Sequence, residues 1–144
     1  MKNKHAEAFM RTAEVWAECS TAKRLKVGAI IVKDNRIISI GYNGMPSGWD
    51  NNCEIEVPQV AHSPRLQTKP EVLHAETNAI AKVARSNESC EGAALFCTHT
   101  PCIDCAKLIY QSGISTVYYK NEYNSNVGSG INFLIQSGVE IQKI

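Results

Sequence analysis

Two short stretches constrain the fold of this chain most, His74-Ala75-Glu76 and Pro101-Cys102-Ile103-Asp104-Cys105. One imidazole and two thiolates are typical zinc ligands, and a set of three protein ligands leaves the fourth tetrahedral position open for water. A purely structural zinc site normally closes with a fourth protein ligand. The chain must therefore fold so that His74 lies beside Cys102 and Cys105, although the two stretches are far apart in the sequence.

Glu76 supplies the other group that such a site needs. Zinc lowers the pKa of its bound water from about 16 to about 7, and a neighbouring carboxylate can then move protons between this water and a substrate. The combination matches the pattern H-x-E…P-C-x-x-C of zinc-dependent nucleobase deaminases. The alternative is a solitary histidine beside a redox or structural cysteine pair, and it would leave Glu76 unexplained.

Length and charge set limits on the partners of the chain. Its 144 residues predict a single domain over residues 1–144, large enough for a hydrophobic core. The formal net charge of +1 provides no strong field for a polyanion, and aromatic residues, which stack on single-stranded nucleic acids, make up 7%. These values favour a small free substrate and predict no stable nucleic-acid partner.

The predicted location is cytoplasmic, or the host cytoplasm if the protein is viral. No apolar run approaches the length of a membrane span, which predicts no membrane association. The N-terminal Met1-Lys2-Asn3-Lys4-His5 is not followed by the apolar core of a signal peptide. The six cysteines are therefore interpreted as thiols or metal ligands before disulfides.

Hydrophobic periodicity predicts a hairpin followed by alternating helices and strands. Two β-rich segments around Asp34-Asn35 indicate the hairpin, and Thr100 is the expected N-cap of a helix that carries Cys102 and Cys105 in its first turn and ends at Gly113. Helices are expected at about 4–18, 74–85, 101–112 and 130–137, and strands at about 25–32, 36–42, 93–98, 114–119 and 139–141.

This order predicts a three-layer α/β/α sandwich around a mixed five-stranded sheet. Two helix starts facing one metal would explain how His74 and Glu76 both reach it. Residues 44–70 lack periodicity and are interrupted by prolines. An unstructured insert of this length is usually functional or held in place by other contacts. A loop is expected at 121–126.

The chain resembles the deoxycytidylate (dCMP) deaminase branch of the cytidine deaminase superfamily. The resemblance covers about residues 9–144, and Gly41-Tyr42-Asn43-Gly44 distinguishes this branch from the deaminases of free nucleosides. It rests on residues 27–33, 36–38, 41–48, 74–80 and 101–107. It implies a cytidine-deaminase-like fold and the zinc-dependent hydrolysis of dCMP to dUMP and ammonia, which supplies dUMP for thymidylate synthesis.

The resemblance also implies roles for individual residues. His74, Cys102 and Cys105 would hold the catalytic zinc, Glu76 would transfer protons, and the backbone N–H of Ala75 would bind the base carbonyl. Asn43 would contact a sugar hydroxyl, although its residue type alone is better explained by a turn that tolerates left-handed backbone.

A basic cluster before the first strand is the candidate phosphate site. It contains Lys23, Arg24 and Lys26, and a phosphate must be met by cations or N–H groups. Ser20, Lys23 or Arg24 are the predicted contacts; the alternative is a solvated loop. Tyr123 could wall the pocket, but Asn124 stands where the family often has a basic residue.

A second, structural zinc is a further possibility that the resemblance raises. Its ligands would be Cys19, Cys53 and His62, with Glu71 able to complete the set. The alternative is two buried free cysteines and a surface histidine.

The resemblance finally implies a regulated homo-oligomer, most often a hexamer. dCTP would activate it and dTTP would inhibit it, each triphosphate accompanied by magnesium. In Gly41-Tyr42-Asn43-Gly44, free N–H groups of a glycine-rich turn could meet phosphates beside Asn43. The alternative is a rigid turn that closes the pocket.

Other functions remain open from the sequence. Related deaminases act on dCTP, cytidine, guanine or adenosine in tRNA. A non-enzymatic zinc module for binding nucleic acid or protein would instead require a closed four-ligand site and would have no use for Glu76.

Overall fold

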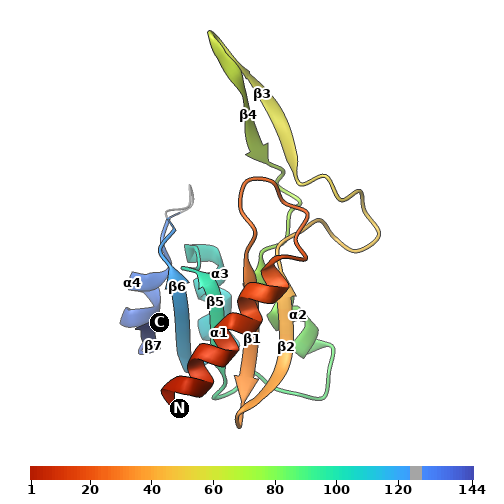
Figure 1. Ribbon diagram of the computed structural model, residues 1–144. Coiled ribbons are helices and arrows are strands. Elements are labelled where there is room, and N and C mark those ends of the chain that lie inside the picture. The colour runs from red at the N-terminus through yellow and green to blue at the C-terminus, as the bar shows by residue number, and fades with distance from the viewer. Residues whose placement is uncertain (124–127) are drawn as a thin grey trace.

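The computed structural model describes residues 1–123 and 128–144 and is built around a mixed five-stranded sheet (Figure 1). The strand order is β2-β1-β5-β6-β7. β1 is antiparallel to both of its neighbours, whereas β5, β6 and β7 are parallel to one another. The strands are β1 (Gly28–Lys33), β2 (Arg36–Tyr42), β5 (Ala94–His99), β6 (Thr116–Asn121) and β7 (Glu140–Lys143).

Helices cover both faces of this sheet, which confirms the predicted three-layer sandwich. The long helix α1 (Asn3–Ala17) packs on one face, where Ile30 and Val32 of β1 point toward it. The alternate residues Ala29 and Ile31 point into the second core, on the opposite face. That core is covered by α2 (Ala75–Ala84), α3 (Ile103–Gln111) and α4 (Ile131–Gln136). Among the described helices, none is both long and apolar enough to cross a membrane.

Local turn chemistry places several element ends where the sequence predicts them. Asp34 and Asn35 both have positive φ, 51° and 58°, so that they form the tight turn between β1 and β2. Gly113 and Gly138 follow α3 and α4 with φ of 92° and 84°, the left-handed conformation that ends a helix.

The predicted N-cap of α3 is wrong. The cap is Cys102, with extended backbone at φ −73° and ψ 169°, and the helix begins at Ile103. Thr100 instead accepts a hydrogen bond from the Tyr123 N–H (2.9 Å) and donates to the Tyr123 carbonyl (3.1 Å). Pairing with a distant segment thus replaced the local capping interaction, and Cys102 precedes the first turn.

The insert at residues 44–70 was expected to lack structure, but it contains a second, two-stranded sheet. β3 (Glu54–Gln59) and β4 (His62–Thr68) form an antiparallel hairpin that projects from the body of the protein (Figure 1). Most of its side chains are exposed on both faces, Ile55 to 47%. Burial therefore imposes no alternation on the hairpin sequence, and periodicity could not reveal it.

Gly41 sets how closely α2 approaches the sheet. A Cβ at this position would overlap the Ala75 carbonyl oxygen and would lie 2.7 Å from the Ala79 nitrogen. Neither backbone atom can move without shifting the start of α2. The bare backbone of β2 is therefore what lets the N-terminal end of α2 lie against the sheet.

We expect Gly41→Ala to lower the free energy of unfolding by about 2–3 kcal/mol, in the upper range for overpacking. Urea denaturation measures this loss. Gly44→Ala is the matched control, because a Cβ at Gly44 meets no atom within 4 Å, and it should change stability by no more than about 0.5 kcal/mol. Equal stabilities of the two variants would contradict the close-approach argument.

Candidate active site

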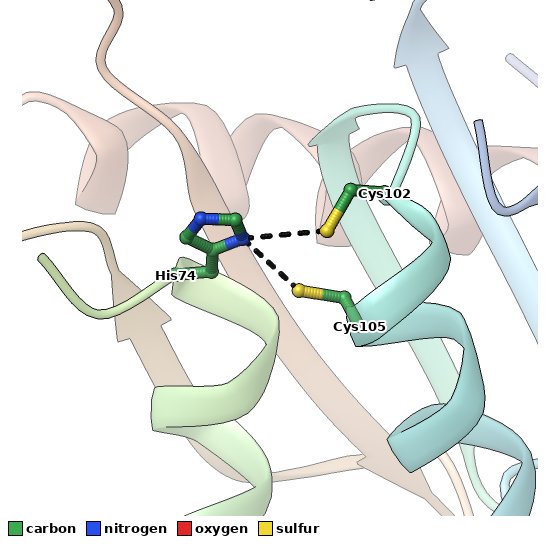
Figure 2. A group of neighbouring side chains, drawn as sticks. All are labelled: His74, Cys102 and Cys105. Carbon is green, nitrogen blue, oxygen red and sulfur yellow. Dashed lines mark hydrogen bonds between the residues drawn. The ribbon is translucent and has the colours of Figure 1, made fainter. Parts of the chain in front are cut away.

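The three predicted zinc ligands lie at the starts of two neighbouring helices. His74 is the N-cap residue of α2, Cys102 is the N-cap of α3, and Cys105 lies in the first turn of α3. Nδ1 of His74 is 3.2 Å from the Sγ atom of Cys105 and 3.6 Å from that of Cys102 (Figure 2). The structure thus brings together the residues that the sequence separates.

This geometry fits a tetrahedral zinc ion. With Zn–S and Zn–N bonds of about 2.3 and 2.0–2.1 Å, a nitrogen and a sulfur ligand lie about 3.6 Å apart. All three donor atoms here are within 4.8 Å of one another. Among the described residues, these three are the only His, Cys, Asp or Glu side chains that form such a group. The set therefore resembles catalytic zinc sites, which keep one position for water.

The three side chains influence one another's protonation. The hydrogen bond from the Cys105 side chain lowers the pKa of Cys102 to about 4, and this same contact raises the pKa of Cys105. The hydrogen bond with Cys102 raises the pKa of His74. Cys102 is therefore a thiolate at neutral pH, the form that binds zinc. Zinc binding would displace the proton of Cys105.

Glu76 lies in the first turn of α2 and is 4% exposed. Burial raises the pKa of its carboxyl group, against the opposing effect of a backbone hydrogen bond. The side chain also interacts with Cys105. A buried carboxyl beside a metal-ligand set, with its pKa moved toward neutrality, is suited to exchange protons with a bound reactant.

A pocket opens over these groups. It extends from the two helix starts to the loop before β1 and to the base of the β3–β4 hairpin. The residues that line it are Ala22, Arg24, Leu25, Val27, Asn43, Glu54, Thr68, Val72, His74, Ala75, Glu76, His99, Thr100, Cys102 and Tyr123.

Asn43 lines the pocket, and its side chain organises the pocket wall. Its Oδ1 accepts the Val27 N–H and its Nδ2 donates to the Leu25 carbonyl, both at 2.8 Å. Ser20 lies behind it, donating to the Asn43 carbonyl at 2.7 Å, and is not among the pocket-lining residues. In the described part of the chain, Ser20 therefore supports the backbone of Asn43 from behind the pocket wall.

The two basic residues predicted to contact the phosphate also differ in whether they line the pocket. Arg24 lines the pocket, and its Nη1 donates to Thr68 Oγ1 at 3.0 Å. Lys23 is exposed, and its backbone N–H donates to Glu54 at 2.9 Å. Tyr123 forms part of the wall, as expected, whereas Asn124 lies outside the described residues.

His99 is a pocket residue that the sequence did not identify. Thr98 Oγ1 accepts the Gly28 N–H at 3.1 Å and lies 2.8 Å from His99 Nδ1. Burial lowers the pKa of His99. Its position directly before Thr100-Pro101-Cys102 was the available signal.

The expected second zinc site is not assembled. Cys53 is buried beside Thr21 at the base of the hairpin, whereas His62 pairs with Gln59 at its far end. A strand rises about 3.3 Å per residue, which separates Cys53 from His62 by about 20 Å. Cys19 and Glu71 are exposed. The hairpin, which the sequence did not reveal, is the physical reason for the error.

Two of the N–H groups that the sequence analysis expected to be free in Gly41-Tyr42-Asn43-Gly44 are paired. Asn43 N–H donates to the Val27 carbonyl at 3.2 Å, and Gly44 N–H donates to the Leu73 carbonyl at 3.1 Å. Gly41 and Tyr42 belong to the β1–β2 ladder. These residues are a strand end joined to the segment before His74, and the N–H groups of Asn43 and Gly44 are already paired.

Metal content tests the ligand assignment. We expect about one zinc ion per chain by mass spectrometry of the dialysed protein, as for a single three-ligand site. Cys105→Ser should lose the metal because it removes a thiolate, whereas Cys53→Ser should retain it. Two zinc ions in the wild-type protein, or zinc retained by Cys105→Ser, would contradict the assignment.

Comparison with known proteins agrees with this geometry. A family model for the cytidine and deoxycytidylate deaminase zinc-binding region matches residues 3–121. The deoxycytidylate deaminase of Enterobacteria phage T4 is 33% identical over 169 residues, which cover 94% of this chain and 88% of that protein. ComE operon protein 2 of Bacillus subtilis is 36% identical over 140 residues, with coverages of 94% and 69%.

A solved structure is similar over the whole chain. The dCMP deaminase from cyanophage S-TIM5, crystallised in complex with dCMP and dUMP, is 48% identical, with a TM-score of 0.87. The alignment covers 100% of this chain and 99% of that one. Because the family model spans most of the chain and includes His74, Glu76 and both cysteines, this protein belongs to the cytidine and deoxycytidylate deaminase family.

Proposed function

We propose that this protein is a zinc-dependent dCMP deaminase, which converts dCMP and water to dUMP and ammonia. The observation that carries the proposal is the three-ligand set with buried Glu76 beside it at the floor of a pocket. The similar cyanophage enzyme, whose structure contains dCMP and dUMP, supports the choice of substrate. Supply of dUMP for thymidylate synthesis and a cytoplasmic location belong to the same proposal.

The chemistry requires one water, one proton carrier and a held substrate. Zinc on His74, Cys102 and Cys105 would make an activated water available at neutral pH. Glu76 takes a proton from the attacking water and transfers it to N3 of the cytosine ring. Once the oxygen–C4 bond has formed, Glu76 takes the remaining proton of the added hydroxyl group and delivers it to the amino group. The C4–nitrogen bond then breaks and ammonia leaves.

Base and sugar would be held by the pocket walls. The Ala75 N–H lies at the start of α2, where backbone donors point out of the helix, and would donate to the base carbonyl. Asn43 would contact a sugar hydroxyl. Its amide already bridges Leu25 and Val27, but it keeps one N–H and one lone pair for a ligand.

Arg24 is the residue we assign to the phosphate. Its guanidinium is exposed and bonded to a neutral hydroxyl, that of Thr68. A bidentate contact with a phosphate is stronger. Arg24 can therefore exchange Thr68 for the substrate at little cost.

Glu76→Gln tests the mechanism. The amide preserves the volume of the buried side chain but cannot carry protons, and we expect kcat to fall by about 10²- to 10⁴-fold. Zinc content and the midpoint of thermal unfolding should stay near the wild-type values. Turnover within a few-fold of the wild type would exclude the mechanism.

Ammonia release separates the candidate substrates. We expect the highest kcat/KM with dCMP when dCMP, dCTP, deoxycytidine and single-stranded DNA are compared at equal enzyme concentration. A preference for dCTP or for another cytosine or adenine compound would change the assigned substrate but would leave the proposed reaction, zinc-dependent deamination, unchanged. Absence of turnover by zinc-loaded protein on any of them would favour the non-enzymatic zinc module.

We further propose that the protein is a homohexamer that magnesium-bound dCTP activates and dTTP inhibits. The observation that supports the regulation is the backbone bridge within the chain between Gly44 and Leu73, at 3.1 and 2.8 Å; the hexamer rests on the resemblance to the family alone. It joins the residue after Asn43 to the residue before His74. An effector that displaces this bridge would move both the sugar contact and the metal ligand, and the coupling must be reciprocal in binding free energy.

The regulatory proposal predicts a sigmoidal dependence of rate on dCMP concentration. Magnesium-bound dCTP should shift the curve to lower dCMP, dTTP should shift it to higher dCMP, and light scattering should give the mass of six chains. Hyperbolic curves unmoved by either triphosphate, from a monomeric protein, would show catalysis without this regulation.

A further inference from the structure

Glu54, the first residue of β3, is a buried carboxylate that the mechanism above does not use. It is 4% exposed, and its Oε2 accepts the backbone N–H groups of Lys23 (2.9 Å) and Arg24 (3.1 Å). Its Oε1 is buried and, within the described part of the chain, has no hydrogen-bond partner. Such an oxygen is costly unless a partner completes it.

The pocket offers room for such a partner, because Glu54 is one of its lining residues. Glu54 lines it together with Ala22, Arg24 and Thr68, on the wall formed by the loop before β1 and the hairpin base. Glu54 and Thr68 are direct partners in the β3–β4 ladder, and Thr68 accepts the Arg24 guanidinium. The unpaired carboxylate oxygen and the cation assigned to the phosphate therefore belong to one small structural unit.

The chemistry of Glu54 limits the partner to a hydrogen-bond donor. A phosphate oxygen would meet a like charge. A metal ion would need further ligands, and Glu54 belongs to no cluster of His, Cys, Asp or Glu in the described residues. The amino group of cytosine must lie at C4 beside Glu76. On a deoxynucleoside monophosphate, the remaining donor is the sugar 3′-hydroxyl.

We infer that Glu54 accepts a hydrogen bond from the 3′-hydroxyl of the nucleotide and makes a free hydroxyl there a condition of good binding. This inference rests on the proposed function. The two N–H groups of Lys23 and Arg24 fix the carboxylate, so that Oε1 alone is left for the ligand. A 3′-phosphate, or the next nucleotide of a strand, would place an anion against it. Glu54 would thus select single nucleotides over polynucleotides.

The test compares kcat/KM for dCMP and for 2′,3′-dideoxycytidine monophosphate, which lacks the 3′-hydroxyl. In the wild-type protein we expect a preference for dCMP of about 10- to 100-fold, the range for a hydrogen bond to a charged group. In Glu54→Gln the preference should fall to a few-fold. The amide oxygen of this variant can still accept the Lys23 and Arg24 N–H groups, but an uncharged amide nitrogen then faces the pocket.

Glu56→Gln is the matched control, because Glu56 lies on the same strand but is exposed; it should keep the full preference. Any contribution of Asn43 to the preference is common to all variants and cancels in their comparison. We expect deoxycytidine 3′,5′-bisphosphate to be a poor substrate of the wild-type protein and to gain activity relative to dCMP in Glu54→Gln.

Two results would overturn the inference. One is equal kcat/KM for the two substrates in the wild-type protein, which decides the question even if Glu54→Gln does not fold. The other is a Glu54→Gln variant that loses activity equally on both, as expected if Glu54 only supports the loop before β1. Failure of the proposed function is distinct from both: dCMP would then not be deaminated at all.

Discussion

The close packing of two helix starts against the sheet is the constraint on which the site depends. Gly41 lets the first turn of α2 lie against β2. Gly130, the N-cap of α4, lets the chain pass close to the start of α3: a Cβ there would lie 2.6 Å from the Cys102 carbonyl oxygen. The Gly130 N–H also donates to the Pro101 carbonyl at 2.9 Å. Two positions without side chains thus bring His74 and Cys102, each an N-cap, to one point.

This arrangement also decides the electrostatics of the site. Helix N-termini carry partial positive charge, which suits the thiolate of Cys102 and the ionised form of Glu76. Burial acts against ionisation of Glu76 and raises its pKa. The balance between these effects leaves a carboxyl group that can both accept and release a proton.

The sequence predicted those features that depend on local patterns or on ligand chemistry. Asp34-Asn35, the glycine at the end of α3 and the His-Cys-Cys ligand set are signals of this kind. Features that depend on contacts between distant segments could not be predicted from the sequence. Thr100 has the residue type of a cap but pairs with Tyr123. His62 has the residue type of a ligand but lies at the far end of a hairpin whose exposed faces carry no periodicity.

The pocket itself combines both kinds of feature. Its floor consists of helix starts on a rigid sheet, whose motif the sequence displays. Its upper wall consists of two irregular segments that fix each other: Ser20 and Asn43 hold the loop before β1 from one side, and Glu54 holds it from the hairpin. Because the proposed reaction chemistry resides in the floor and the proposed substrate contacts in the wall, we expect substitutions in the wall to change the substrate without disturbing the three metal-ligand candidates.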